Sequence, residues 1–188
     1  MFIFDNQYKN MIIDTHSHIY LPEFDSDRDS MVKRAENEGV SLVLMPAIDS
    51  EVHLSMFRVE RDFSGKCLSM MGLHPCSVKA GYKGEIDLMT DYFEKRRFVA
   101  VGETGLDFYW DKTFTKEQYD SFQIQIELAK QYDIPVVIHS RNSIDECIKM
   151  IKENQQGNLK GVFHCFSGNE KQAKEIIDLG FYLGIGGV

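Results

Sequence analysis

Short hydrophobic runs alternate with longer segments of helical pattern, and this order repeats along the chain. Each run predicts a buried strand of a parallel sheet, because such strands are covered on both faces. The segments between them carry apolar residues three and four positions apart, as at Ile144, Ile148 and Ile151, which predicts amphipathic helices. The predicted strands are Met11–His16, Ser41–Pro46, Cys67–Gly72, Phe98–Gly102, Pro135–His139, Gly161–His164 and Phe181–Ile185.

A helix is predicted after each of the first six strands. Two of the helix starts have the spacing of a capping box, Thr115 with Gln118 and Ser143 with Glu146. The two side chains of such a box satisfy exposed backbone N–H groups at the start of a helix. The predicted helices are Asp27–Gly39, Glu51–Asp62, Glu85–Lys95, Thr115–Asp133, Ser143–Asn154 and Glu170–Leu179.

Repeated strand–helix units can build a doubly wound open sheet or a closed eight-stranded barrel. In a barrel, reactive side chains gather at the carboxyl ends of many strands, whereas an open sheet concentrates its site at one switch point. Here five predicted strands end at a reactive side chain, so we expect an α/β fold with a (β/α)8 barrel of the TIM type. These side chains are His16, His74, Glu103, His139 and His164.

Composition is consistent with one folded domain. The 188 residues are 43% hydrophobic, and we assign residues 1–10 to an N-terminal extension and 11–188 to a single domain. No apolar run could cross a bilayer and residues 1–10 do not resemble a signal peptide, so we expect a cytoplasmic protein without a membrane partner. The net charge of −8 argues against a broad basic surface for nucleic acid, so any phosphate must be held locally.

Histidines supply the candidate metal ligands. His16 and His18 stand two residues apart at a strand end, where both imidazoles can point to one side and bind one ion. Singly, His139 and His164 could each be a core histidine with one hydrogen bond. Five of the six histidines in the chain nevertheless follow predicted strands, and we assign the sixth, His53, to a solvated helix face.

Glu103 is the candidate bridging carboxylate. It follows Gly102 and precedes Gly105, which would let the backbone turn sharply and bring the carboxylate into a cavity. The alternative is a solvated loop acid. Four imidazoles with one bridging carboxylate match a hydrolytic centre in which two cations activate water and stabilise the attacking and leaving oxygens.

Five motifs, in order, resemble the TatD family of metal-dependent deoxyribonucleases among the amidohydrolase-like barrels. The likeness runs from about Met11 to the end of the chain. It implies hydrolysis of DNA phosphodiester bonds, in single strands or at ends, with two divalent ions. Imidazole-rich ligation favours zinc or manganese over magnesium, which prefers oxygen ligands. The motifs are Ile13-Asp-Thr-His-Ser-His18, Gly72-Leu-His-Pro75, Gly102-Glu-Thr-Gly-Leu-Asp107, Ile138-His-Ser-Arg141 and His164-Cys-Phe-Ser-Gly168.

The resemblance also implies the role of each metal-site residue. His16 and His18 would hold one ion, His139 and His164 the other, and Glu103 would bridge them as a metal ligand and catalytic residue.

Further residues of the motifs would act on the substrate. His74 resembles the family's substrate-side histidine, a catalytic and substrate-binding residue that would contact the scissile phosphate, with packing beside Pro75 as the alternative. Arg141, just before a predicted helix, suits a substrate phosphate, or is a surface arginine. Asp107 would orient ligand histidines. Tyr109 and Trp110 could stack on a base of a single strand, or simply pack.

The sequence departs from the family pattern at its end. Members carry a late Ser-Asp-x-Pro or Thr-Asp-x-Pro motif at an eighth strand, whereas the sequence stops at Gly184-Ile-Gly-Gly-Val188. We therefore expect an incomplete barrel of about seven parallel strands, with self-association through its open edge. Two alternatives stay open: an inactive fragment or pseudoenzyme that retains metal binding, or another barrel hydrolase such as a lactonase or phosphotriesterase.

Overall fold

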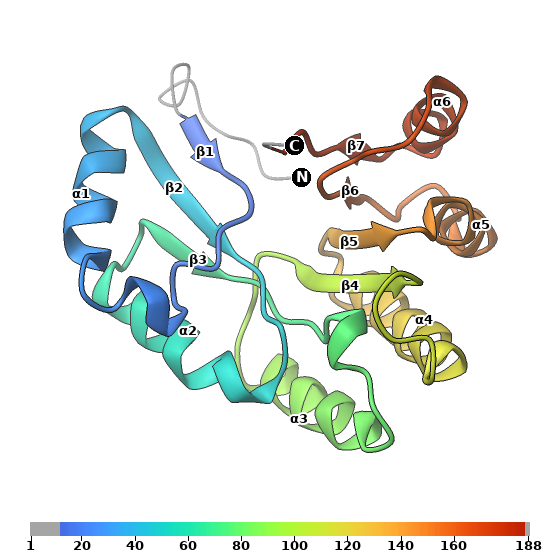
Figure 1. The fold of residues 1–188 in the computed structure, drawn as a ribbon, viewed down its shortest axis with the longest axis horizontal. Coiled ribbons are helices and arrows are strands. Elements are labelled where there is room, and N and C mark those ends of the chain that lie inside the picture. Colours follow the sequence, from blue (N-terminus) through green and yellow to red (C-terminus); the bar gives the residue numbers. More distant parts are fainter. Residues whose placement is uncertain (1–11, 187–188) are drawn as a thin grey trace.

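The computed structural model describes residues 12–186, which form parallel strands alternating with helices (Figure 1). The assigned extension, residues 1–10, lies outside the described residues. The strands are β1 (Ile12–Asp14), β2 (Val40–Met45), β3 (Cys67–Ser69), β4 (Val101–Asp107), β5 (Val136–Arg141), β6 (Gly161–Phe163) and β7 (Tyr182–Leu183). The α-helices are α1 (Arg28–Asn37), α2 (Ser50–Asp62), α3 (Tyr82–Lys95), α4 (Thr115–Tyr132), α5 (Ile144–Asn154) and α6 (Glu170–Asp178), with 3-10 turns η2 (Pro22–Phe24) and η3 (Pro75–Ser77).

The strands pair in chain order and in parallel, as β1-β2-β3 and β4-β5-β6-β7. A parallel bridge between Met71 and Val101 connects the two sheets, and the Gly102 N–H donates to the Met71 carbonyl at 2.9 Å. The strands therefore follow one curved surface with the helices outside it (Figure 1). Within residues 12–186 no strand ladder joins β1 to β7. The predicted α/β fold, an incomplete TIM-type barrel with seven parallel strands, is confirmed.

The helices pack their apolar stripes against this curved sheet. In α5, Ile148 and Ile151 are buried and Ile144 lies partly buried beside them, as the spacing predicts. Burial of an isoleucine side chain contributes about 1.5–3 kcal/mol. No helix among the described residues has both the length and the hydropathy to cross a membrane.

Both predicted capping boxes are wrong. The Thr115 hydroxyl donates to the Lys112 carbonyl at 2.8 Å, and the Ser143 hydroxyl donates to the Leu106 carbonyl in β4 at 2.6 Å. A capping box occurs instead at α6, where Asn169 and Gln172 each accept the other's backbone N–H. A serine or threonine hydroxyl has several acceptors in reach, so spacing alone does not select the cap.

The assignment of His53 to a solvated face is also wrong. Its side chain lies between α2 and α3, with 2% of the residue exposed, and its ring contacts Tyr92 edge-on at a centroid distance of 5.4 Å. The buried residues of α2 are His53, Met56 and Val59, spaced three apart, so the histidine occupies the apolar stripe. Helical spacing, rather than polarity, determines its burial.

Candidate metal centre

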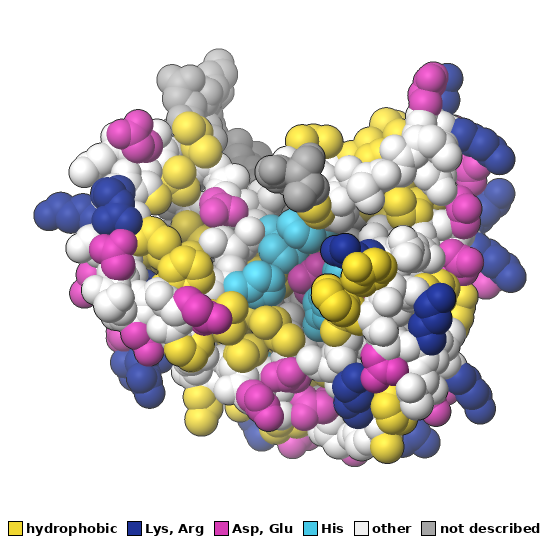
Figure 2. All heavy atoms as spheres, in the orientation of Figure 1, with side chains coloured by type: hydrophobic (Ala, Val, Ile, Leu, Met, Phe, Trp, Pro, Cys, Tyr) yellow, Lys and Arg dark blue, Asp and Glu magenta, His cyan; other side chains and the backbone are white. Residues whose placement is uncertain are grey.

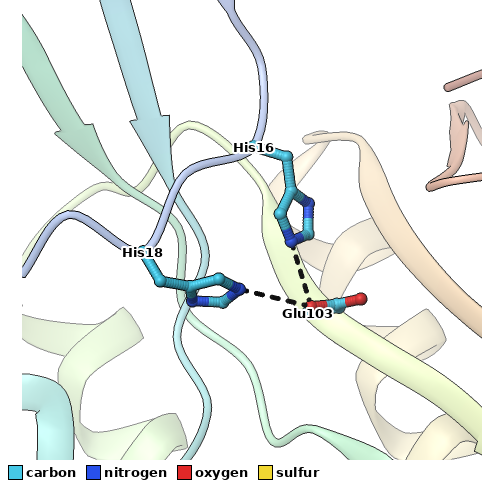
Figure 3. Close-up of side chains that lie close together, drawn as sticks. All are labelled: His16, His18 and Glu103. Atoms are coloured by element: carbon cyan, nitrogen blue, oxygen red, sulfur yellow. Dashed lines mark ion pairs between the residues drawn. The ribbon is translucent and has the colours of Figure 1, made fainter. Parts of the chain in front are cut away.

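Glu103 lies at the centre of the site. Its side chain projects from within β4, and only 3% of the residue is exposed. The carboxylate is therefore buried as predicted and is not a solvated loop acid, but the flanking glycines form no sharp turn, because Val101–Asp107 is one strand. Glu103 Oε2 lies 3.1 Å from His16 Nε2 and 3.8 Å from His18 Nε2 (Figure 3).

Two more histidines lie beside the same carboxylate. Glu103 Oε1 lies 3.2 Å from His139 Nδ1, and Oε2 lies 3.8 Å from His74 Nε2. Two groups of donor atoms thus share Glu103, and in each the atoms lie within 4.8 Å of one another. One is His16, His18 and Glu103; the other is His74, Glu103 and His139.

Backbone contacts fix the loop that carries the first two histidines. The Ser17 N–H donates to the Leu44 carbonyl of β2 at 3.1 Å, and the His16 N–H donates to the Asp14 carboxylate at 3.1 Å. Both imidazoles point from this loop toward Glu103, as expected from their alternation along an extended chain (Figure 3).

Gly105 allows the close approach of β4 to β5. Its φ is +131°, and a Cβ there would lie 2.1 Å from the His139 carbonyl oxygen. Only glycine fits this position. The pairing of Gly105 with His139 keeps the imidazole beside the Glu103 strand.

His18 and His139 each have one ring nitrogen held by a buried oxygen. His139 Nε2 lies 2.8 Å from Asp107 Oδ2. His18 Nδ1 lies 2.7 Å from the Tyr20 hydroxyl, which itself donates to the Pro46 carbonyl at 2.6 Å. Because these oxygens accept from the ring, the other nitrogen of each neutral imidazole could present its lone pair to a metal ion. The protonated form of His139 instead donates from Nδ1 to Glu103. The expected orienting contact of Asp107 is therefore present.

His74 has the opposite arrangement. Its Nδ1 accepts from the Cys76 backbone N–H at 3.1 Å, so in the neutral ring Nε2 carries the proton. That Nε2 faces His139 Nδ1 at 3.2 Å. His74 can therefore donate a hydrogen bond into the centre.

His164 reaches the same cluster but lies against His16. The two rings are stacked, with centroids 3.4 Å apart and an interplanar angle of 12°. The His164 N–H donates to the Ile138 carbonyl at 2.8 Å, which ties it to β5. The structure thus brings all five predicted ligands together, although His164 belongs to neither of the two groups of donor atoms within the described part of the chain.

Burial keeps several of the imidazoles neutral. It lowers the pKa of His18, and it lowers the pKa values of His74 and His164 to about 4. Burial opposes the charge on Glu103, but hydrogen bonds from His139 and then His16 outweigh it and hold the Glu103 pKa well below its usual range. The set is a buried carboxylate among imidazoles.

His139 is the exception. Burial lowers its pKa, but the hydrogen bond and charge of Glu103, with the contact to Asp107, raise it overall. A cation at this position would compete with the proton that these acids attract.

The donor set fits divalent metal ions. His16 Nδ1 is buried without a hydrogen-bond partner in the described structure, while its Nε2 faces Glu103. Neutral imidazole and ionised carboxylate are the forms that bind cations.

The predicted substrate residues lie beside this cluster. Arg141 ends β5, and its guanidinium lies 4.3 Å from the centre of the Tyr109 ring and 5.9 Å from that of Trp110. Sequence reasoning missed Tyr20. The only signal for it was its position two residues after His18.

Parallel strand–helix units around a shared carboxylate and its histidines define the class of barrel-type metal-dependent hydrolases. The chain belongs to the TatD family: residues 13–188 match the family described as TatD related DNase.

Several relatives support this membership. The chain is 30% identical over 179 residues to the uncharacterized metal-dependent hydrolase YabD of Bacillus subtilis, covering 94% of this chain and 69% of that protein. It is 32% identical to the uncharacterized metal-dependent hydrolase YjjV of Escherichia coli K12, and the match covers 93% of this chain and 68% of YjjV. The crystal structure of YjjV superposes with a TM-score of 0.85 at 31% identity, over 94% of this chain and 68% of that chain. A Klebsiella pneumoniae relative named 3'-5' ssDNA/RNA exonuclease TatD is 30% identical over 88% of this chain and 62% of that protein.

Proposed function

We propose that the protein hydrolyses phosphodiester bonds of DNA, in single strands or at ends, with water activated by two divalent ions. The observation that carries the proposal is the position of the Glu103 carboxylate beside His16 and His18 through one oxygen and beside His139 through the other, where it could serve two ions. The exonuclease name of the Klebsiella pneumoniae relative supports nucleic acid as the substrate class.

His16 and His18 would hold one ion, His139 and His164 the other, and Glu103 would bind both. When bound, such a pair lowers the pKa of a water molecule and stabilises the attacking and leaving oxygens of the displacement. Tyr20 and Asp107 would fix the tautomers of His18 and His139. Zinc and manganese suit this donor set better than magnesium.

His74 would bind the substrate. Its Nε2–H points into the centre because Nδ1 is occupied by the Cys76 N–H. A hydrogen bond from Nε2 to a nonbridging phosphate oxygen would orient the scissile bond and stabilise its developing charge.

The test combines elemental analysis with a cleavage assay on a single-stranded oligonucleotide, in the presence of zinc, manganese or magnesium. We expect about two ions per chain and metal-dependent cleavage. Glu103→Gln should weaken both ions and abolish cleavage, because the amide lacks the bridging charge. Glu94→Gln, an exposed carboxylate of α3, is the matched control.

The alternatives give different results in the same assay. Bound metal without cleavage of DNA would favour a metal-binding pseudoenzyme. Hydrolysis of lactones or phosphotriesters in preference to DNA would favour the other barrel hydrolases. Loss of a single ion in Glu103→Gln would contradict the bridge. Cytoplasmic location and self-association through the open edge stay predictions.

A further inference from the structure

An aromatic and basic cluster borders the metal centre, formed by Tyr109, Trp110 and Arg141. The Arg141 guanidinium lies 4.3 Å from the Tyr109 ring centre, and the Tyr109 and Trp110 rings meet edge-on at a centroid distance of 4.8 Å. Figure 2 shows hydrophobic and basic side chains next to the histidine cluster on the same face. We call these three residues the rim cluster.

The rim cluster is not part of the core. Tyr109 is 51% and Trp110 69% exposed, so both rings leave large apolar faces in water. A tyrosine and a tryptophan that served only for packing would bury these faces. Exposed aromatic faces beside an active site are suited to stacking on a ligand.

The segment that carries the two rings is held in place. Asp107 Oδ1 accepts the backbone N–H groups of Tyr109 at 2.9 Å and Trp110 at 3.0 Å. The Phe108 N–H donates to the Arg141 carbonyl at 2.9 Å. Because the backbone is fixed before binding, a stacked ligand would lose little of its binding energy to ordering the loop.

Arg141 has an uncompensated charge. Within residues 12–186, no carboxylate lies within 4.0 Å of its guanidinium, and its side chain donates no hydrogen bond. Stacking on Tyr109 holds the guanidinium plane in a defined direction while its N–H groups stay free. Planar donors of this kind recognise phosphate oxygens. Although the net charge of the chain is −8, the positive charge of Arg141 would attract an anion locally.

The rim cluster is connected to the metal centre through β5 and through Asp107. Arg141 follows His139 by two residues on β5, so both side chains leave the same side of the strand from Cα atoms about 7 Å apart. Asp107 contacts His139 through Oδ2 and the rim backbone through Oδ1. A spacing of about 7 Å along the strand is close to the distance between neighbouring phosphates of one nucleotide strand.

We propose that the rim cluster is a nucleotide subsite for single-stranded DNA, in which a base stacks on the exposed face of Trp110 while Arg141, held against the Tyr109 ring, binds the phosphate next to the cleaved bond. This inference rests on the proposed function, since it takes DNA as the ligand. Stacking tolerates any base sequence but requires an unpaired base. The subsite therefore selects single-stranded over duplex substrate.

Trp110 itself reports the binding, because it is the single tryptophan of the chain. The full chain is titrated with a phosphorothioate thymidine oligonucleotide that resists cleavage, and tryptophan fluorescence is followed. An abasic oligonucleotide with the same number of phosphates is the ligand control. We expect quenching by the thymidine strand and little by the abasic strand.

Variants separate stacking from charge, with binding measured by anisotropy of a labelled oligonucleotide. Trp110→Ala should weaken binding about 5- to 100-fold, as expected for one lost base stack, while Trp110→Phe should largely keep it. Arg141→Ala should lower the slope of log affinity against log salt by about 0.7, the value for one phosphate of a single strand. Arg141→Lys should keep the slope. The exposed Tyr182→Ala and Arg61→Ala are controls that should bind as the parent does.

The outcomes distinguish this inference from the proposed function. Equal quenching by thymidine and abasic strands, absence of binding, or unchanged affinity of Trp110→Ala would overturn the subsite. If one of these results were found and the parent chain still cleaved DNA in the presence of metal, the proposed function would hold and only the subsite would be rejected. If the rim variants lost binding while the parent chain cleaved nothing, the subsite would stand and the proposed hydrolysis would fail.

Discussion

At the scale of single residues, the centre depends on which nitrogen of each imidazole is occupied. Tyr20 holds His18 Nδ1 and Asp107 holds His139 Nε2, which leaves one lone pair on each ring facing Glu103. At His74 the Cys76 N–H occupies the lone pair instead. Three histidines of similar burial thereby differ in the atom they offer: neutral His18 and His139 can offer a lone pair to a metal ion, and His74 can donate a hydrogen bond.

We expect Tyr20→Phe to weaken binding of one ion about 10- to 100-fold, because His18 loses the oxygen that fixes its tautomer. The lost hydrogen bonds should also lower the free energy of unfolding by about 1 kcal/mol. Competition titration against a zinc chelator measures the first effect and urea unfolding the second. Tyr182→Phe, an exposed tyrosine, is the control. Unchanged zinc affinity in Tyr20→Phe would show that the hydroxyl does not orient the ligand.

Sequence could predict the residues that gather in the site, since five strand ends carried them. It could not supply Tyr20, whose hydroxyl acceptor is the Pro46 carbonyl, 26 positions further along the chain. Nor could the sequence show which ring nitrogen of each histidine carries the proton, because that depends on contacts between separate strands.

At the scale of elements, the start of α6 depends on its capping box. We expect Asn169→Ala to lower the free energy of unfolding by about 1 kcal/mol, because the Gln172 N–H loses its acceptor. Thr115→Ala should cost less, since the Thr115 side chain caps nothing in α4. Urea unfolding of both variants checks this, and equal losses would contradict the assignment of the cap.

The α2–α3 contact should make stability depend on pH through His53. Burial lowers the His53 pKa, partly offset by the charges of Glu85 and Asp49. Below about pH 6.5 His53 is protonated in the unfolded chain but stays neutral in the folded chain. The free energy of unfolding therefore falls as the pH decreases toward the pKa of His53 in the folded chain. The substitution His53→Leu removes this titrating group. The variant should therefore gain stability relative to the parent as the pH falls from 7 to 5, by at most about 1.4 kcal/mol per pH unit.

Urea unfolding at a series of pH values measures the effect. Near pH 8 the His53 side chain is uncharged in both the folded and the unfolded chain. The difference in free energy of unfolding between His53→Leu and the parent should therefore not change with pH there. Parallel stability curves from pH 8 to pH 5 would refute the role of His53.

Element order was predictable from periodicity, whereas the bounds of β4 were not. The segment from Glu103 to Asp107 contains two acids, a threonine and a glycine, so it lacks the apolar run by which a buried strand is recognised. These residues are buried because the ends of barrel strands line the site. Function here overrides the pattern on which strand prediction rests.

At the scale of the whole molecule, the metal centre joins the two sheets. His16 and His18 follow β1 of the first sheet, while Glu103 and His139 lie on β4 and β5 of the second. In the described residues these sheets also meet through backbone hydrogen bonds, which join residues 69–71 to residues 99–102 and join Ala47 to Gly102 and Glu103. An ion bound to both sides would connect them.

We expect zinc to stabilise the fold, by about 2.7 kcal/mol at a free concentration one hundred times its Kd. Thermal unfolding with zinc and then with excess chelator measures the gain and its reversal. Glu103→Gln should show a much smaller gain than Glu94→Gln. Identical midpoints with and without zinc would contradict a centre that spans the two sheets.

The parallel order of the strands followed from the rules for strand–helix connections, and the structure bears it out. The division into two sheets did not follow, because it depends on the spacing of the backbone hydrogen bonds between residues 69–71 and residues 99–102, which leaves no periodic trace in the sequence.

The two oxygens of Asp107 limit how this scaffold can be redesigned. One oxygen contacts a ligand imidazole and the other the backbone beneath the exposed rings. If the chain hydrolyses DNA and binds single strands as proposed, a change at Asp107 would impair metal binding and strand binding together. A reagent meant to capture single strands without cutting them would therefore keep Asp107 and replace Glu103.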